Sequence, residues 1–162
     1  MKTVWAKKDG AVLLRQIDLM ALSKKDRAAI FAKYNGHCAY CGCELGKGWH
    51  ADHLKPVRRK MKFCHDKQRH VPTGEVRYPK RDCPENFNPA CPSCNINKHS
   101  MSLEDFRSLI GGFIKSLNRD SPQYRIAKRY GFVIEVDQPV LFHFEKIKMI
   151  PDTIRNFEQE KE

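Results

Sequence analysis

Two matched cysteine pairs are the strongest chemical signal in this sequence. Cys38 and Cys41 form one C-x-x-C pair, and Cys91 and Cys94 form a second. This spacing lets two thiolates occupy adjacent vertices of a tetrahedron, so the two pairs together predict a closed structural Zn²⁺ site. The alternative is four buried cysteines or a redox pair, which two matched pairs make the weaker interpretation.

The three remaining cysteines, Cys43, Cys64 and Cys83, lie outside this pattern. We assign them no role, because a free cysteine commonly behaves as a small apolar residue. Cys43 is close enough in sequence to Cys41 to compete as the fourth zinc ligand. The odd total of seven cysteines, without a signal-peptide core at the N-terminus, argues against a disulfide framework.

Polar residues suited to phosphate chemistry lie between and just after the two pairs. Asp52 and His53 precede Pro56, Asn86 precedes the second pair, and Asn95 follows it directly. Hydrolysis of a phosphodiester bond needs a base that activates water, a cation that stabilises negative charge, and a group that orients the base. An imidazole, a carboxylate and a side-chain amide can supply these functions.

Taken in order, C-x-x-C, D-H-x-x-P and N-x-x-x-x-C-x-x-C-N-x-x-K form a pattern that resembles the HNH endonuclease family over about residues 36–100. The resemblance implies a ββα-metal core with a four-cysteine zinc site, of the small type frequent in phages and prophages. It also implies metal-dependent hydrolysis of DNA, by nicking or double-strand cleavage, that leaves 5′-phosphate and 3′-hydroxyl ends.

The resemblance assigns a role to each matching residue. His53 would be the general base, and Asp52 would ligate Mg²⁺ or another divalent ion such as Mn²⁺ or Ni²⁺. Asn86 would accept a hydrogen bond from His53 and fix its orientation. Adjacent residues of a regular strand point to opposite faces, so the strand must bend or end for Asp52 and His53 to reach one phosphate.

The residues after the second cysteine pair leave the metal site open to two interpretations. Asn95 stands where many relatives carry a metal-binding histidine, so the chain resembles an H-N-N variant. His99 lies four residues further along an expected helix and is a rival ligand on the same face. Lys98 would direct a cation at phosphate, and the alternative for it is a solvated surface lysine.

The charge of the chain favours a polyanionic partner. Its 162 residues carry a formal net charge of +11, which points to nucleic acid and, by the resemblance, to DNA. Basic side chains concentrate in residues 58–81, beginning with Arg58, Arg59 and Lys60. This stretch shows neither helical nor strand periodicity, so we expect an inserted loop that contacts the phosphate backbone or, alternatively, a solvated mobile loop.

Capping residues and apolar periodicity predict helices and hairpins on both sides of the motif at residues 36–100. Ser23 predicts a helix over residues 24–34, and Ser102 predicts a helix whose apolar stripe over residues 103–117 belongs to the core. The alternative for this stripe is self-association of the chain. Ser121 begins a short helix that Gly131 ends. We also expect hairpins over residues 3–16 and over residues 132–144.

These observations predict one α+β domain over residues 1–150, with the core motif at 36–100, a helix-rich extension at 102–150 and a disordered tail at 151–162. No apolar stretch is long enough to span a membrane, so we expect a cytoplasmic protein. Phage packaging or other DNA-processing proteins are candidate partners. Two alternatives stay open: a non-catalytic zinc-knuckle DNA-binding regulator and a nuclease directed at RNA.

Overall fold

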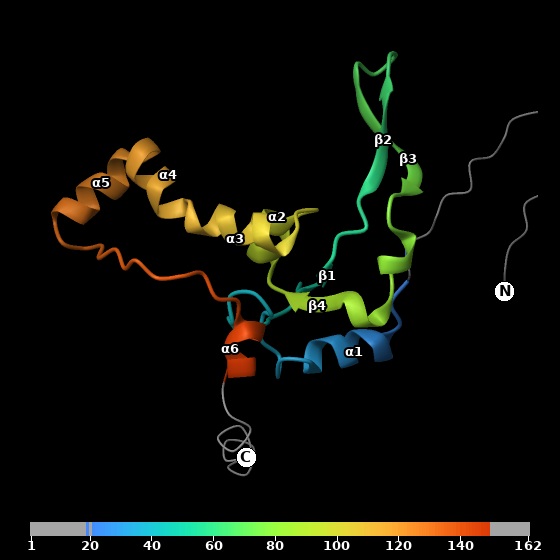
Figure 1. Cartoon of the computed structure of the whole chain (residues 1–162), viewed down its shortest axis with the longest axis horizontal. Coiled ribbons are helices and arrows are strands. Elements are labelled where there is room, and N and C mark those ends of the chain that lie inside the picture. Colours follow the sequence, from blue (N-terminus) through green and yellow to red (C-terminus); the bar gives the residue numbers. More distant parts are fainter. Residues whose placement is uncertain (1–18, 20, 150–162) are drawn as a thin grey trace, which may run out of the picture.

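The computed structural model describes residue 19 and residues 21–149. Within them the chain forms a mixed α+β fold with two small antiparallel sheets of two strands each (Figure 1). The hairpin expected over residues 3–16 and the tail at 151–162 lie outside the described residues. The elements in chain order are α1 (Lys24–Ala32), β1 (His50–His53), β2 (Arg59–Cys64), β3 (Arg69–Val76), the 3₁₀ turns η1 (Pro79–Arg81) and η2 (Pro84–Asn86), β4 (Phe87–Ala90), α2 (Pro92–Lys98), α3 (Leu103–Gly111), α4 (Phe113–Asp120), α5 (Pro122–Arg129) and α6 (His143–Met149).

The first sheet pairs β1 with β4 in antiparallel register, so that Asp52 lies opposite Asn88 and His53 opposite Phe87. Helix α2 begins directly after β4, and α1 packs against β4, where the Lys33 ammonium donates to the carbonyl of Phe87. The polar residues predicted from sequence therefore lie on or next to the strands β1 and β4 and the helix α2.

The capping residues begin the helices where the sequence predicts. Ser23 and Asp26 form a reciprocal capping box at the start of α1, and Ser102 and Asp105 form another at the start of α3. Each box satisfies backbone N–H groups that the first helical turn leaves unpaired. Helix α5 likewise begins after Ser121, whose hydroxyl accepts from the backbone of Tyr124.

The second sheet corrects one prediction, because residues 58–81 are not a loop without regular structure. Strands β2 and β3 pair as an antiparallel hairpin that projects from the rest of the chain (Figure 1). Met61 and Phe63 alternate with lysines in β2, but both are exposed, and β3 shows no such alternation, so no buried apolar face marks these strands. The strands are defined by the backbone pairing between β2 and β3, which the apolar periodicity of the sequence did not predict.

The apolar stripe after Ser102 is also only partly as predicted. The helix breaks at Gly112, which separates α3 from α4. Phe106 of α3 is buried in the core, whereas Phe113, Ile114 and Leu117 of α4 are exposed. The prediction that the whole stripe belongs to the core is therefore wrong for its second half.

The hairpin predicted over residues 132–144 is wrong. Residues 132–142 form no strand, and α6 begins at His143. Phe142 and Phe144 instead pack into the core, where backbone N–H groups of His143 and Phe144 donate to the carbonyls of Tyr40 and Ala39. The aromatic residues at the end of this segment therefore pack in the core and do not pair as a second strand.

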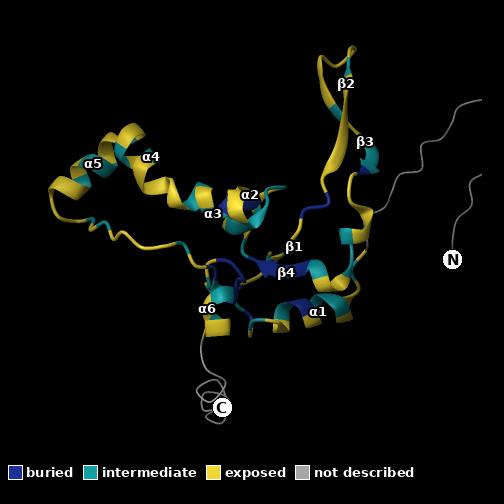
Figure 2. Ribbon diagram, viewed as in Figure 1, coloured by how far each residue is buried: buried dark blue, intermediate teal, exposed yellow. Residues whose placement is uncertain are grey.

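The core gathers around the first cysteine pair. Its buried members are Cys38, Ala39, Tyr40, Leu45, Ala90, Phe106, Phe142 and Phe144. Figure 2 shows this burial along β4 and the chain before β1, while the hairpin and the helices α4 and α5 are mostly exposed. A salt bridge from Arg107 to Glu145, 2.6 Å long, ties α3 to α6 across the edge of this core.

Candidate functional site

The four cysteines of the two C-x-x-C pairs come together as predicted. The sulfur atoms of Cys38, Cys41, Cys91 and Cys94 all lie within 4.8 Å of one another, and those of Cys41 and Cys91 are 3.8 Å apart. Tetrahedral zinc with Zn–S bonds of about 2.3 Å requires sulfur separations of roughly 3.8 Å. The cluster could therefore hold a metal ion such as zinc, and Cys43 lies outside it.

Hydrogen bonds join these sulfurs to the backbone and to one another. The backbone N–H of Cys91 donates to the sulfur of Cys38, and that of Cys94 donates to the sulfur of Cys91, each over 3.4 Å. The hydrogen bond with the Cys94 thiol is the main cause that lowers the pKa of Cys38 to about 4 and raises the pKa of Cys94. Four cysteine sulfurs at these separations are the donor set of a closed structural zinc site, so the cluster fits the ion.

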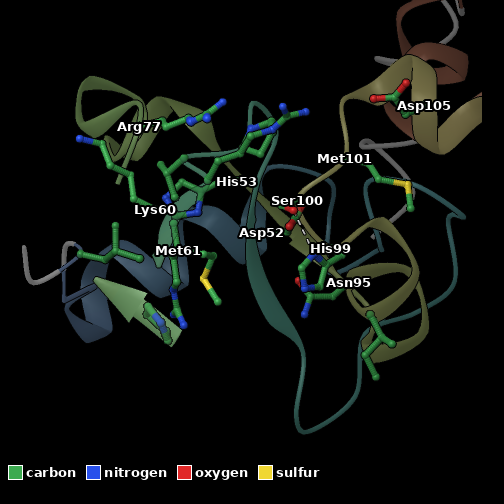
Figure 3. Close-up of a pocket in the computed structure, with 17 residues that line it drawn as sticks. Asp52, His53, Lys60, Met61, Arg77, Asn95, His99, Ser100, Met101 and Asp105 are labelled. Carbon is green, nitrogen blue, oxygen red and sulfur yellow. Dashed lines mark hydrogen bonds between the residues drawn. The ribbon is translucent and has the colours of Figure 1, made fainter. Parts of the chain in front are cut away.

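Four of the residues that the sequence assigns to the base and the metal site line one shared pocket. Asp52, His53, Asn95 and His99 all contribute to its wall. In Figure 3, Asp52 and His53 lie between the end of α2, with Asn95 and His99, and the base of the hairpin. Strand β1 ends at His53, as required for two adjacent residues to face one pocket.

The imidazole of His53 has a partner that the sequence did not reveal. Its Nε2 atom lies 2.8 Å from Oδ1 of Asp82, and only 17% and 11% of the two side chains are exposed. The ring also packs on Phe87, with ring centroids 4.2 Å apart. No local pattern marks Asp82, because it lies 29 residues from His53 and follows a short 3₁₀ turn.

Asn86 does not make the hydrogen bond predicted for it. Its Oδ1 accepts from the backbone N–H of Lys55 over 2.9 Å, and its amide donates to the carbonyls of Lys55 and Arg81 over 2.8 and 2.7 Å. Asn86 therefore ties the chain that leaves β1 to the turn that precedes Asp82. It holds the two segments whose ends carry His53 and Asp82, and it acts on the imidazole only through them.

Asp52 and Lys98 form a buried ion pair. Oδ2 of Asp52 lies 2.9 Å from Nζ of Lys98 and also accepts from the hydroxyl of Tyr40. The Lys98 side chain is fully buried, and its ammonium donates to the carbonyl of His53 over 2.8 Å. The solvated-surface interpretation of Lys98 is therefore wrong, because the ammonium is buried against Asp52, and its contact with phosphate stays a prediction.

Burial and the neighbouring carboxylate of Asp52 both raise the pKa of the Tyr40 phenol. Loss of hydration is the main cause that raises the pKa of the Tyr40 phenol well above its usual range, and the charge of Asp52 raises it further. Tyr40 therefore stays a hydrogen-bond donor. Its hydroxyl and the ammonium of Lys98 fix one carboxylate oxygen of Asp52.

Asn95 and His99 both line the pocket, Asn95 from within α2 and His99 from the residue that ends this helix. Asn95 is half-buried within α2, whereas His99 caps the end of that helix with a positive φ of 47°. The Nδ1 atom of His99 lies 3.0 Å from the Ser100 hydroxyl. Within the described part of the chain, the four cysteines are the one group of acidic, histidine or cysteine side chains placed closely enough to hold a metal.

The base of the hairpin gives the pocket a cationic wall. Arg58, Arg59 and Lys60 line it from one side of the hairpin, and Arg77 lines it from the other. The Lys60 ammonium is paired with Glu75 over 2.8 Å, and Arg58 has a positive φ of 49°. The arginines predicted to bind nucleic acid therefore line the same pocket as His53, and Figure 3 shows Lys60 and Arg77 on the side of His53.

No protein-family model, curated protein or solved structure gives a significant match to this chain. Among residues 19 and 21–149, no helix is long and apolar enough to cross a membrane.

Proposed function

We propose that this chain is a divalent-metal-dependent endonuclease of the HNH type that hydrolyses phosphodiester bonds in DNA. One observation carries the proposal. Asp52, His53 and Asn95, which match the HNH pattern in sequence, line a single pocket whose wall also carries three arginines and Lys60. The arrangement of β1, β4 and α2 beside four metal-competent cysteines supports the same ββα-metal interpretation.

His53 is suited to take a proton from water. Its Nε2 atom is held by the Asp82 carboxylate, which favours the tautomer that carries the proton on Nε2. Nδ1 then keeps a lone pair, and no described residue forms a hydrogen bond with it. We therefore assign Nδ1 of His53 as the basic atom and Asp82 as the residue that positions it.

Asp52 and Asn95 are suited to hold a hard divalent ion. Tyr40 and Lys98 occupy Oδ2 of Asp52, which leaves Oδ1 as the oxygen for metal binding. The amide oxygen of Asn95 or the imidazole of His99 would add a second ligand, and Mg²⁺ commonly completes its shell with water and phosphate oxygens. Such an ion, when bound, would stabilise negative charge on the phosphoryl group and the leaving oxygen.

The hairpin and the net charge support DNA as the substrate. A strand that enters the pocket would pass Arg59 and Arg77, whose guanidinium groups suit phosphate oxygens. These contacts follow the backbone and supply affinity without reading bases. The four-cysteine cluster, with zinc bound, would hold the chain before β1 against α2 and keep the pocket in shape.

A second candidate is a zinc-knuckle DNA-binding regulator without turnover, and one observation favours it. The Lys98 ammonium already neutralises Asp52, which weakens that carboxylate as a metal ligand. The two candidates differ in one outcome, because the regulator would bind DNA and leave it intact.

The deciding experiment incubates the protein with supercoiled plasmid and Mg²⁺, Mn²⁺ or Ni²⁺, with a chelator control. We expect nicked or linear product with metal, loss of cutting in His53→Ala, and unchanged cutting in His50→Ala, an exposed histidine on the same strand. Intact plasmid under every metal, or equal cutting by His53→Ala, contradicts the proposal. A parallel incubation with RNA tests the sugar preference, and cutting of RNA alone would overturn DNA as the substrate.

A further inference from the structure

The segment formed by α4, α5 and the chain up to residue 141, here called the arm (residues 112–141), projects from the rest of the molecule. Figure 1 shows the arm extending away from the core, and Figure 2 shows that its surface is largely exposed. Its exposed large apolar side chains are Phe113, Ile114, Leu117, Ile126, Tyr130, Phe132, Ile134, Val136 and Leu141. Soluble monomeric proteins rarely expose so many large apolar side chains on one element, and large exposed apolar patches commonly mark interaction sites.

The most exposed of these residues form a regular row. Phe132, Ile134 and Val136 are 81%, 85% and 70% exposed at every second position of the chain after α5, and Tyr130, in the turn that ends α5, is 73% exposed. The rings of Tyr130 and Phe132 stack on each other, with centroids 6.1 Å apart. Alternation of this kind is the pattern of a strand with one apolar face.

Glu135 fixes the row on the arm. Its carboxylate accepts from the Asn118 amide over 2.6 Å and from the Lys128 ammonium over 2.7 Å, and the Tyr124 hydroxyl lies 3.2 Å away. These bonds tie the segment to both α4 and α5, so the neighbouring apolar side chains are held outward. The carboxylate is already paired with Lys128, so covering the row would bury no unpaired acid.

The backbone of residues 133–136, the later part of the row, is free to pair. Within the described part of the chain, residues 133–136 belong to no strand and donate to no backbone carbonyl. An extended segment with unpaired N–H and C=O groups is a template for pairing with another strand. An antiparallel pair is self-complementary, because each copy presents the same residues to the other about a two-fold axis.

We propose that the arm is a self-association surface, through which two copies of this chain meet by antiparallel pairing of residues 133–136, with Ile134 near the two-fold axis. The available area fits this occupant. The nine apolar side chains of the arm expose on the order of 1,000 Å² per copy, so a stable interface, which buries about 800 Å² per partner, would cover most of them. The association does not depend on the nuclease activity, although a dimer of a nuclease would carry two cutting sites.

The test measures the molar mass of the full chain by light scattering after size exclusion, over the micromolar range. We expect twice the chain mass for the wild type and the single chain mass for Phe132→Ser/Ile134→Ser. Met149→Ser, which changes a similarly exposed apolar residue on α6, should keep the dimer. Equal zinc content and circular dichroism of all variants show that the fold is intact.

Two results would overturn the proposal. The first is a wild type that stays monomeric across the range, and the second is a double variant that dimerises as strongly as the wild type. Residues 1–18 are the rival occupant of the row, and deletion of this segment tests them. A monomeric full chain that dimerises only after the deletion would assign the row to the N-terminal segment and reject our interpretation for the intact protein.

Discussion

Nε2 of His53 and Oδ1 of Asp82 lie 2.8 Å apart, although 29 residues of chain separate them. The whole β2–β3 hairpin lies within that separation. The hairpin therefore returns the chain to the end of β1 and delivers the carboxylate that holds the imidazole. Asn86 reinforces this return with hydrogen bonds to Lys55 and to Arg81, which precedes Asp82.

Asp82→Ala should release the imidazole of His53. We expect DNA cutting to fall roughly 10- to 100-fold, the range found when a partner that orients a functional side chain is removed. The ¹⁵N chemical shifts of the ring should show loss of the preference for the tautomer protonated on Nε2. Asp66→Ala, in the exposed turn of the hairpin, is the matched control. An unchanged tautomer in Asp82→Ala would contradict the positioning role even if cutting fell.

Lys98→Met should destabilise the fold strongly. The substitution leaves Asp52 buried without its cation and removes the bond to the carbonyl of His53. Breaking one half of a buried pair costs about 3–5 kcal/mol. Denaturant unfolding should measure this loss, while Lys115→Met on the exposed face of α4 should change the free energy of unfolding by less than about 0.5 kcal/mol. Adding Asp52→Asn to Lys98→Met should restore part of the stability, and no restoration would argue against the ion pair.

Zinc should be part of the folded protein. Elemental analysis of the purified chain should find one zinc per molecule, and Cys91→Ser or a strong chelator should unfold the core, because the four sulfurs join segments far apart in sequence. Cys64→Ser, which changes a hairpin cysteine outside the cluster, should leave both zinc content and fold unchanged. A Cys91→Ser protein that keeps its zinc and its melting temperature would refute the metal site.

The double variant Arg59→Gln/Arg77→Gln should weaken DNA binding and flatten its salt dependence. For every phosphate that the protein no longer neutralises, the slope of log K against log salt concentration should fall by about 1. Fluorescence anisotropy with a labelled duplex at several salt concentrations measures this slope. Lys24→Gln/Lys25→Gln on α1 removes the same charge away from the pocket. Equal slopes for the two double variants would mean that the hairpin wall makes no specific contribution.

The Arg107–Glu145 salt bridge should stabilise the protein against acid. The hydrogen bond from Arg107 holds the pKa of Glu145 below its usual value of 4.5. The stabilisation is therefore complete above about pH 4.5 and is lost as pH falls through the lowered pKa of the folded state. Glu145→Gln should lower the melting temperature at pH 7 and should have a smaller effect at pH 3. Glu104→Gln, which removes the more exposed partner of the same arginine, should show little of this pH dependence.

Features set by neighbouring residues could be predicted from the sequence. The spacing within each C-x-x-C pair brings two sulfurs together locally, and Ser23 and Ser102 begin their helices through hydrogen bonds three residues away. The ordered motif around His53 singled out residues that line one pocket in the structure. These features depend on a few adjacent backbone angles and little on the rest of the fold.

The tertiary structure alone decided the partners of the polar side chains and the position of the apolar ones. Asp82 reaches His53, and Lys98 turns inward to Asp52, only because separate segments pack together. The hairpin strands are exposed on both faces, so no burial pattern marked them. The stripe after Ser102 is continuous in sequence, but the break at Gly112 puts one half in the core and the other on the arm. Periodicity shows that a face is apolar, whereas only the packed chain determines what covers it.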